Sequence, residues 1–151
     1  MYKQLPGETT STRLEELLSP TGKVFLQIDL DANDQWIYAN WIGYPTHDNV
    51  AKGAFAYLDW MQAKGRSAVL NDNRNLVGRW DNSLDWLEQH WIPYAVKKGL
   101  KYWAHLDTTG TFSADSADQL RARVRGRFEV QLFDDQAAAE NWLRSKLRLK
   151  R

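Results

Sequence analysis

Hydrophobic residues alternate with polar residues in two runs near the N-terminus, which predicts a pair of β-strands. The first run is "KVFLQIDL" (23–30) and the second is "QWIYANWIG" (35–43). The polar segment "DAND" (31–34) lies between them, so we expect an antiparallel β-hairpin. The segment before it, "TRLEELL" (12–18), is compatible with either a helical turn or an irregular strand.

The period then changes to that of amphipathic helices. In residues 46–65, Val50, Ala54, Tyr57 and Met61 recur every three or four positions, and Thr46 or Asp48 can cap the start. A second helix is expected over 82–99, where Pro93 should kink or split it. Two further helices are expected over 113–125, with Ser113 or Asp115 as the N-cap, and over 135–150.

Short apolar segments at 67–72, 100–107 and 128–134 separate these helices and predict three more strands. The resulting order is β-β-α-β-α-β-α-β-α. Strands that alternate with helices indicate an α/β fold, with a mostly parallel sheet flanked by helices and an antiparallel hairpin at its N-terminal edge. We expect one domain over residues 12–151, preceded by a flexible tail at 1–11.

Composition narrows the classes of function. The 151-residue chain has no cysteine, which excludes disulfides and thiolate chemistry, and 43% hydrophobic residues, which favours a folded core. The sequence has no apolar run of about 18 residues and no signal-peptide core, so we expect a cytoplasmic protein without a membrane span. Residues 121–151 carry nine of the 20 Lys and Arg residues. We interpret them as a solvated helix face with a basic tail rather than a nucleic-acid site.

The polar segment "NDNRNLVGRWDNS" (71–83) follows a predicted buried strand and is the best candidate site. Ligands of α/β proteins gather at the carboxyl ends of parallel strands. Arginines beside a helix N-terminus can bind an anion or a partner protein. The alternative is that these residues only cap the helix and fix the loop, for example through an ion pair from Asp72 to an arginine. The candidate residues are Asp72, Arg74, Arg79, Asp81 and Ser83.

No other motif indicates catalysis. His47, His90 and His105 lack metal-binding spacing, and we expect structural roles for them. Asp107 should lie at the same sheet edge as Asp72, where two carboxylates could hold a cation, although capping and turn formation explain Asp107 as well. The sequence has no Gly-rich phosphate loop and no nucleophile elbow. We therefore expect no cofactor, no metal and no enzymatic activity.

Three segments resemble the SpoIIAA-like branch of the STAS superfamily, small stand-alone bacterial proteins also described as STAS/SEC14. They are the hairpin 23–43, the strand and polar loop "AVLNDNRNL" and the stretch "WLEQHWIPYAVKKGLKYWAHL". The resemblance covers roughly residues 20–146. It implies a SpoIIAA-like fold and a regulatory protein-interaction module that binds another protein or a second copy of itself. It also implies a phosphorylatable serine, whose nearest counterpart is Ser83, although the motif around it differs.

A second class of function stays open. Eight tryptophans are many for a chain of this length, and some of them could line an apolar pocket. The alternative is therefore a small-molecule or lipid-binding domain with an apolar pocket near residues 72–83, gated by the arginine loop.

Overall fold

The N-terminal half of the sheet is an antiparallel meander. The computed structural model describes residues 11–148. The predicted hairpin is confirmed: β2 (Val24–Asp31) pairs antiparallel with β3 (Ile37–Gly43), with Ile28 opposite Ala39. The segment before it forms a strand, β1 (Ser11–Leu18), on the outer side of β2, with two register irregularities.

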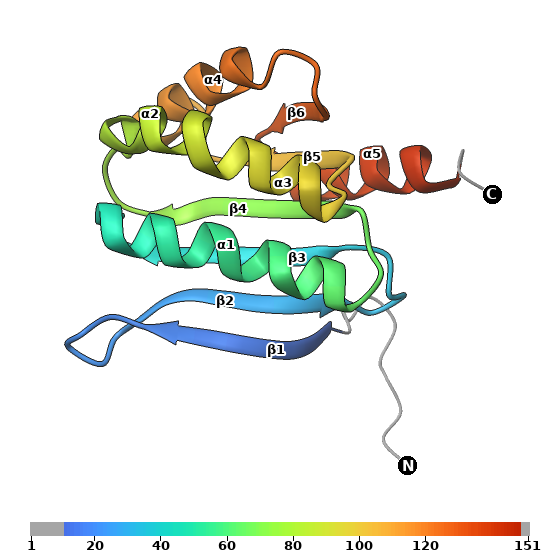
Figure 1. The fold of residues 1–151 in the computed structure, drawn as a ribbon, viewed down its shortest axis with the longest axis horizontal. Helices are drawn as coiled ribbons and strands as arrows, with labels where there is room; N and C mark the ends of the chain where they lie inside the picture. Colours follow the sequence, from blue (N-terminus) through green and yellow to red (C-terminus); the bar gives the residue numbers. More distant parts are fainter. Residues whose placement is uncertain (1–10, 149–151) are drawn as a thin grey trace.

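The C-terminal half is parallel, as the alternation of strands and helices predicts. The sheet has six strands in the chain order β1-β2-β3-β4-β5-β6, and the pairs from β3 to β6 are all parallel (Figure 1). The remaining elements are α1 (His47–Ala63), β4 (Ala68–Leu76), η1 (Asp81–Ser83), α2 (Leu84–Trp86), η2 (Leu87–Trp91), α3 (Ile92–Lys98), β5 (Tyr102–Leu106), α4 (Phe112–Val124), β6 (Glu129–Phe133) and α5 (Gln136–Arg148).

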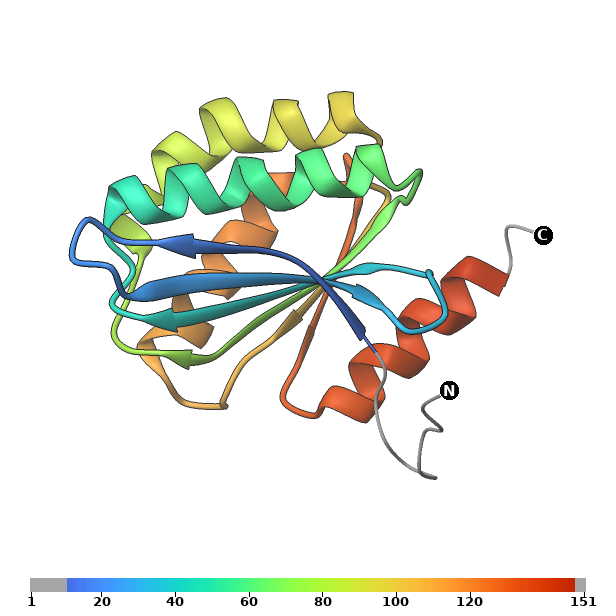
Figure 2. The ribbon, with the colours of Figure 1, turned by 90° about the horizontal axis from the view of Figure 1, so that it is seen from below.

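Helices cover the two faces of the sheet unequally. One apolar core lies between the sheet and α1, η2, α3 and α4, and it contains Leu26, Trp41 and Trp91. A smaller core lies under α5 and contains Leu70 and Leu143. Figure 2 shows α5 on the opposite side of the sheet from α1 and α3. Successive strand residues point to opposite faces, so Val69 contributes to the first core and Leu70 to the second.

The helix that contains Pro93 is interrupted, as its proline predicts. The five residues of η2 form a π-helical turn directly before α3, in which the Ile92 N–H bonds to the Leu87 carbonyl. Proline has no N–H and its ring clashes with the carbonyl four residues earlier. A π-turn at this point widens the helical backbone, so the helix continues past Pro93 as α3. Trp91, in this turn, is 1% exposed and belongs to the larger core.

Two predicted boundaries are wrong. β4 does not end at Asp72 but continues to Leu76, so most of the predicted polar loop is strand. The N-cap of α4 is Thr111, whose side chain accepts a hydrogen bond from the Ala114 N–H, and neither Ser113 nor Asp115 has that role. The predicted flexible tail lies outside the described residues except for Ser11, which begins β1.

Candidate functional site

The extension of β4 divides the predicted site between the two faces of the sheet. Because side chains alternate along a strand, Asn71 and Asn73 point toward α4, whereas Asp72 and Arg74 point toward α5. Their hydrogen bonds confirm this division: Asn73 bonds to Ser113 of α4, and Arg74 bonds to Gln136 of α5. The structure therefore brings Asp72 and Arg74 together and separates both from Asn71 and Asn73.

On the α5 face, Asp72 is the centre of a closed ion-pair cluster. Its carboxylate is 1% exposed and accepts hydrogen bonds from Arg74 Nη2 at 2.9 Å, Arg74 Nε at 3.1 Å and the Tyr38 hydroxyl at 2.5 Å. Burial acts to raise the pKa of Asp72, but the hydrogen bonds from Arg74 and Tyr38 outweigh it, and the pKa is lowered. The pairing of Asp72 with an arginine, proposed as the alternative to ligand binding, is confirmed.

The other three candidate residues lie beyond the end of β4. The Arg79 guanidinium lies over the Phe112 ring, 4.4 Å from its centroid, and 3.6 Å from the Asp81 carboxylate. Ser83 is fully buried, and its hydroxyl lies 3.1 Å from His47 Nδ1. Arg79 and half-buried Asp81 are accessible to a partner, whereas a kinase could reach Ser83 only if η1 opened.

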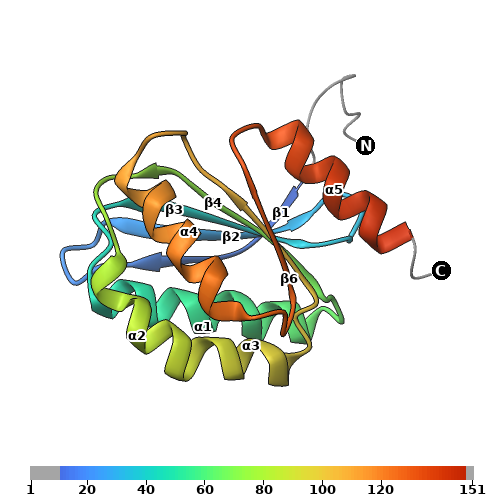
Figure 3. The ribbon, with the colours of Figure 1, turned by 90° about the horizontal axis from the view of Figure 1, so that it is seen from above.

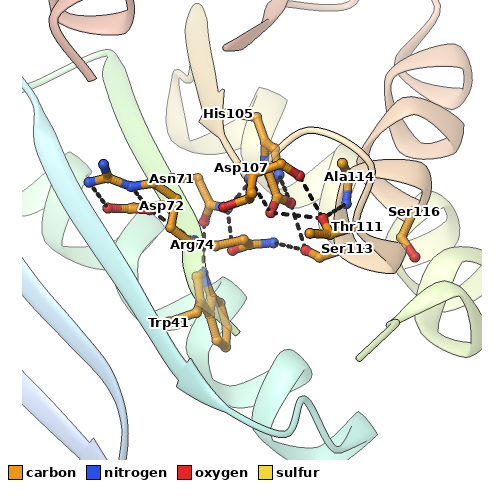
Figure 4. Close-up of polar contacts among 12 residues, drawn as sticks. Trp41, Asn71, Asp72, Arg74, His105, Asp107, Thr111, Ser113, Ala114 and Ser116 are labelled. Carbon is orange, nitrogen blue, oxygen red and sulfur yellow. Dashed lines mark hydrogen bonds and ion pairs between the residues drawn. The ribbon is translucent and has the colours of Figure 1, made fainter. Parts of the chain in front are cut away.

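A buried chain of hydrogen bonds, which we call the polar ladder, crosses the other face at the carboxyl ends of β4 and β5 (Figure 4). Asn71 accepts from Trp41 Nε1 at 2.8 Å and donates to Asn73 Oδ1 at 3.0 Å. The ladder continues to His105, Asp107 and Ser113, and all members are at most 7% exposed. These are Trp41, Asn71, Asn73, Trp80, His105, Asp107 and Ser113.

The donors and acceptors of the polar ladder fix the state of His105. An indole N–H can only donate, so the Asn71 atom that faces Trp41 is the oxygen. The Asn71 amide nitrogen then faces His105 Nδ1 at 3.2 Å and donates to it. Nδ1 must be unprotonated to accept, which places the proton on Nε2, 3.1 Å from Asp107 Oδ2. His105 is thus the neutral Nε2–H tautomer.

Ser113 completes the ladder. Its hydroxyl donates to Asp107 Oδ2 at 2.7 Å and accepts from Trp80 Nε1 and Asn73 Nδ2. His105 Nε2 donates to the same Asp107 oxygen. The arrangement joins β3, β4 and β5 to the start of α4.

Sequence reasoning missed the ladder for two reasons. The alternation of Asn71 and Asn73 after Val69 has the period of a strand, and this signal could have extended β4. The role of Ser113 depends on Asp107 and Trp80, which approach it only in the folded chain. His105 is buried and hydrogen-bonded, as predicted. Asp107 is held in the ladder, on the opposite face of the sheet from Asp72, so these two carboxylates do not share a site.

Exposed apolar side chains gather at one edge of the molecule. β1 runs antiparallel to β2 and β2 to β3, so β1 points in the same direction as the parallel strands. The chain leaves β1, β3, β4 and β5 at one common edge, and Figure 3 shows the β1–β2 turn and the loops after β4 and β5 at the same end. Four of the five exposed large hydrophobic residues of the described chain follow or end these strands: Leu18, Tyr44, Val77 and Phe112. With Arg79 they form what we call the carboxyl-edge rim.

Metal-binding and membrane-spanning features are not found in residues 11–148. No group of three or more His, Asp or Glu side chains there is arranged to hold a metal ion. No helix in the same range combines the length and the apolar character needed to cross a bilayer.

Comparison with protein-family models, with curated proteins and with solved structures gives no match to this chain.

Proposed function

We propose that this chain is a non-enzymatic protein-interaction module that binds another protein through its carboxyl-edge rim. The observation that carries the proposal is the position of the exposed apolar residues. Tyr44 is 75% exposed and Phe112 is 62% exposed, and both lie at the edge where β1 and the parallel strands end. Of the five exposed large hydrophobic residues in the described chain, only Val96, on α3, lies elsewhere.

The rim has the composition of a protein interface. Interfaces are enriched in aromatic residues and arginine, and these residues dominate the binding energy. Here the guanidinium of Arg79 already lies against the ring of Phe112, so both side chains are oriented before a partner arrives. Preorganised side chains lose less entropy on binding. Arg79 and Asp81 are the two predicted site residues that this proposal retains as partner contacts.

The width of the rim is adequate for a specific contact. Leu18 lies at the end of β1, and Phe112 follows β5, four strands away in the sheet. Neighbouring strands are about 4.8 Å apart, so the rim extends over roughly 19 Å. A patch of this width is compatible with the ~800 Å² that each partner contributes to a standard interface.

The resemblance of the sequence to SpoIIAA-like STAS proteins supports a regulatory role of this kind. The mixed sheet with an antiparallel N-terminal hairpin is compatible with that fold. In this proposal the module acts by binding and not by turnover. Its partner is another protein, and self-association would be the special case in which two rims meet.

The test is a binding measurement with matched variants. Proteins retained from native extract would first be identified, and the affinity of the purified partner would then be measured by calorimetry. We expect Tyr44→Ser, Phe112→Ser and Arg79→Ala each to weaken binding by about tenfold or more. Val96→Ser, which removes an exposed hydrophobic residue away from the rim, and Arg74→Ala should leave the affinity unchanged if they stay folded. Sedimentation of the chain alone reports self-association.

Equal binding by the rim variants and by Val96→Ser would refute the proposal. A turnover of any substrate by the purified chain would refute its non-enzymatic part. Melting curves of every variant separate a loss of binding from a loss of folding.

A further inference from the structure

An aromatic cavity lies between the sheet and α1, η2 and α4, next to the polar ladder. Its volume is about 40 Å³. A water molecule needs roughly 10–15 Å³, so the space exceeds that of a single water. Its wall includes four tryptophans and one tyrosine, which are Trp41, Tyr57, Trp80, Trp91 and Trp103.

The cavity has a mouth at the carboxyl-edge rim. Pro45 and Leu76 are half-buried, whereas every other residue of the wall is buried. Pro45 follows Tyr44 and Leu76 precedes Val77, and the Val77 N–H bonds to the Gly43 carbonyl, which holds the two strand ends together. Access is therefore from the edge where ligands of parallel sheets collect, and Arg74, on the other face, cannot act as its gate.

One polar atom of the wall lacks a partner. The indole N–H groups of Trp41, Trp80 and Trp91 donate to Asn71, Ser113 and the Ala54 carbonyl. The indole N–H of Trp103 is buried and has no hydrogen-bond acceptor among residues 11–148. Burial raises the pKa of Tyr57, and the neighbouring Trp103 and Trp91 indoles partly oppose this rise. The Trp103 N–H therefore lies near the Tyr57 oxygen, but the two groups do not reach the geometry of a hydrogen bond.

We propose that this cavity binds a small, neutral, flat organic molecule whose hydrogen-bond acceptor pairs with Trp103 Nε1. The wall selects a neutral ligand because all of its described residues are uncharged, and burial of a charge without a partner is costly. Its aromatic rings favour a flat ring. The unpaired N–H selects an acceptor such as a ring nitrogen or a carbonyl, since a buried donor without a partner is unfavourable.

The present volume sets a condition on binding. A cavity that holds benzene measures about 150 Å³, so a single ring enters only when side chains move. We expect this movement at the mouth, where Leu76 and Pro45 are only half-buried. Ligand binding in the cavity does not require the proposed protein contact, although the mouth lies beside the rim residues Tyr44 and Val77.

Pyridine and benzene are a matched pair of probes, because they share a shape and differ by one acceptor. The ¹⁵N-labelled chain has eight tryptophans, and the Trp103 indole signal is assigned as the one missing in Trp103→Phe. At a pH where pyridine is neutral, we expect added pyridine to move the Trp103 indole signal downfield until the site is saturated. Benzene should bind about tenfold more weakly, and benzoate should not bind.

Variants separate a specific site from general hydrophobic binding. Trp103→Phe should bind pyridine and benzene with equal affinity, because the N–H is gone. Trp142→Phe, on the opposite face of the sheet, should bind pyridine like the wild type. Should Trp103→Phe not fold, Ala54→Val, which adds volume to the wall, should weaken pyridine binding. Three results would overturn the proposal: no pyridine binding at millimolar concentration, equal binding of pyridine and benzene by the wild type, or unchanged pyridine binding by the cavity variants.

Discussion

Gly53 in α1 lies directly against the ring of Trp41 in β3. A Cβ atom at Gly53 would overlap Trp41 Cη2 and lie 2.8 Å from Leu26 Cδ2. The Trp41 ring cannot turn away freely, because its N–H is bonded to Asn71. The close approach of α1 to the sheet therefore depends on a residue without a side chain.

We expect Gly53→Ala to destabilise the protein by about 1–3 kcal/mol, as overpacking does in a filled core. A Gly→Ala change inside a helix ordinarily stabilises a protein, because alanine there is about 0.5–1 kcal/mol more favourable than glycine. Urea unfolding measures the difference. Ala51→Gly, at a half-buried position of the same helix, is the control and should lose about 1 kcal/mol. A Gly53→Ala variant as stable as the wild type would contradict the packing described here.

The polar ladder makes a spectroscopic prediction. His105 should be observed as the neutral Nε2–H tautomer, because its Nδ1 accepts from Asn71 and its Nε2 donates toward Asp107. Long-range ¹H–¹⁵N NMR of the imidazole distinguishes the two nitrogens. His90, exposed on η2, provides a reference signal in the same spectrum. A protonated Nδ1 at neutral pH would contradict this assignment of donors and acceptors at His105.

The order of elements could be predicted from the sequence because each element carries its own period. Alternation identifies the hairpin, and the i, i+3/i+4 repeat of α1 identifies a helix whose apolar stripe must face the sheet. The extent of β4 was not predicted, because its alternating positions 71 and 73 carry asparagine, a residue typical of turns. Asn71 and Asn73 read as a loop, and they are buried in a strand only because Trp41, His105 and Ser113 satisfy them from distant parts of the chain.

The candidate site was only partly predictable for the same reason. The Asp72–Arg74 pair is local, two residues apart on one face of a strand, and it was foreseen as an alternative. The ladder and the rim are not local. Phe112 meets Arg79 because the loops after β4 and β5 leave the sheet at the same edge, which follows from the topology and not from the spacing of the two residues.

The π-turn places Trp91 at the centre of the larger core. Its ring contacts those of Trp103, Phe128 and Tyr57, with centroids 5.6, 5.8 and 6.4 Å away. We expect Trp91→Ala to lose about 3–5 kcal/mol, because the cavity left behind cannot close. Trp86→Ala, at a half-buried position one turn earlier, should lose clearly less. Chemical unfolding measures both, and similar losses would mean that Trp91 has no special place in the core.

The Asp72 cluster predicts how stability depends on pH. Asp72→Asn removes the charge that faces Arg74 but leaves an acceptor for Tyr38, so we expect a loss of about 1–3 kcal/mol at neutral pH. The pKa of Asp72 is lower in the folded protein than the ordinary value near 3.9 of an unfolded chain. The carboxylate therefore contributes stability that is complete above about pH 5 and is lost as the pH falls through the folded-state pKa. Urea titrations of wild type and variant at a series of pH values should give a difference in unfolding free energy that is constant between about pH 5 and 7 and shrinks below about pH 4.

Asp118→Asn, whose partner Arg121 is on the exposed face of α4, is the control and should change stability by less than about 1 kcal/mol. A difference between wild type and Asp72→Asn that grows toward acid would mean that burial, and not Arg74, dominates the carboxylate.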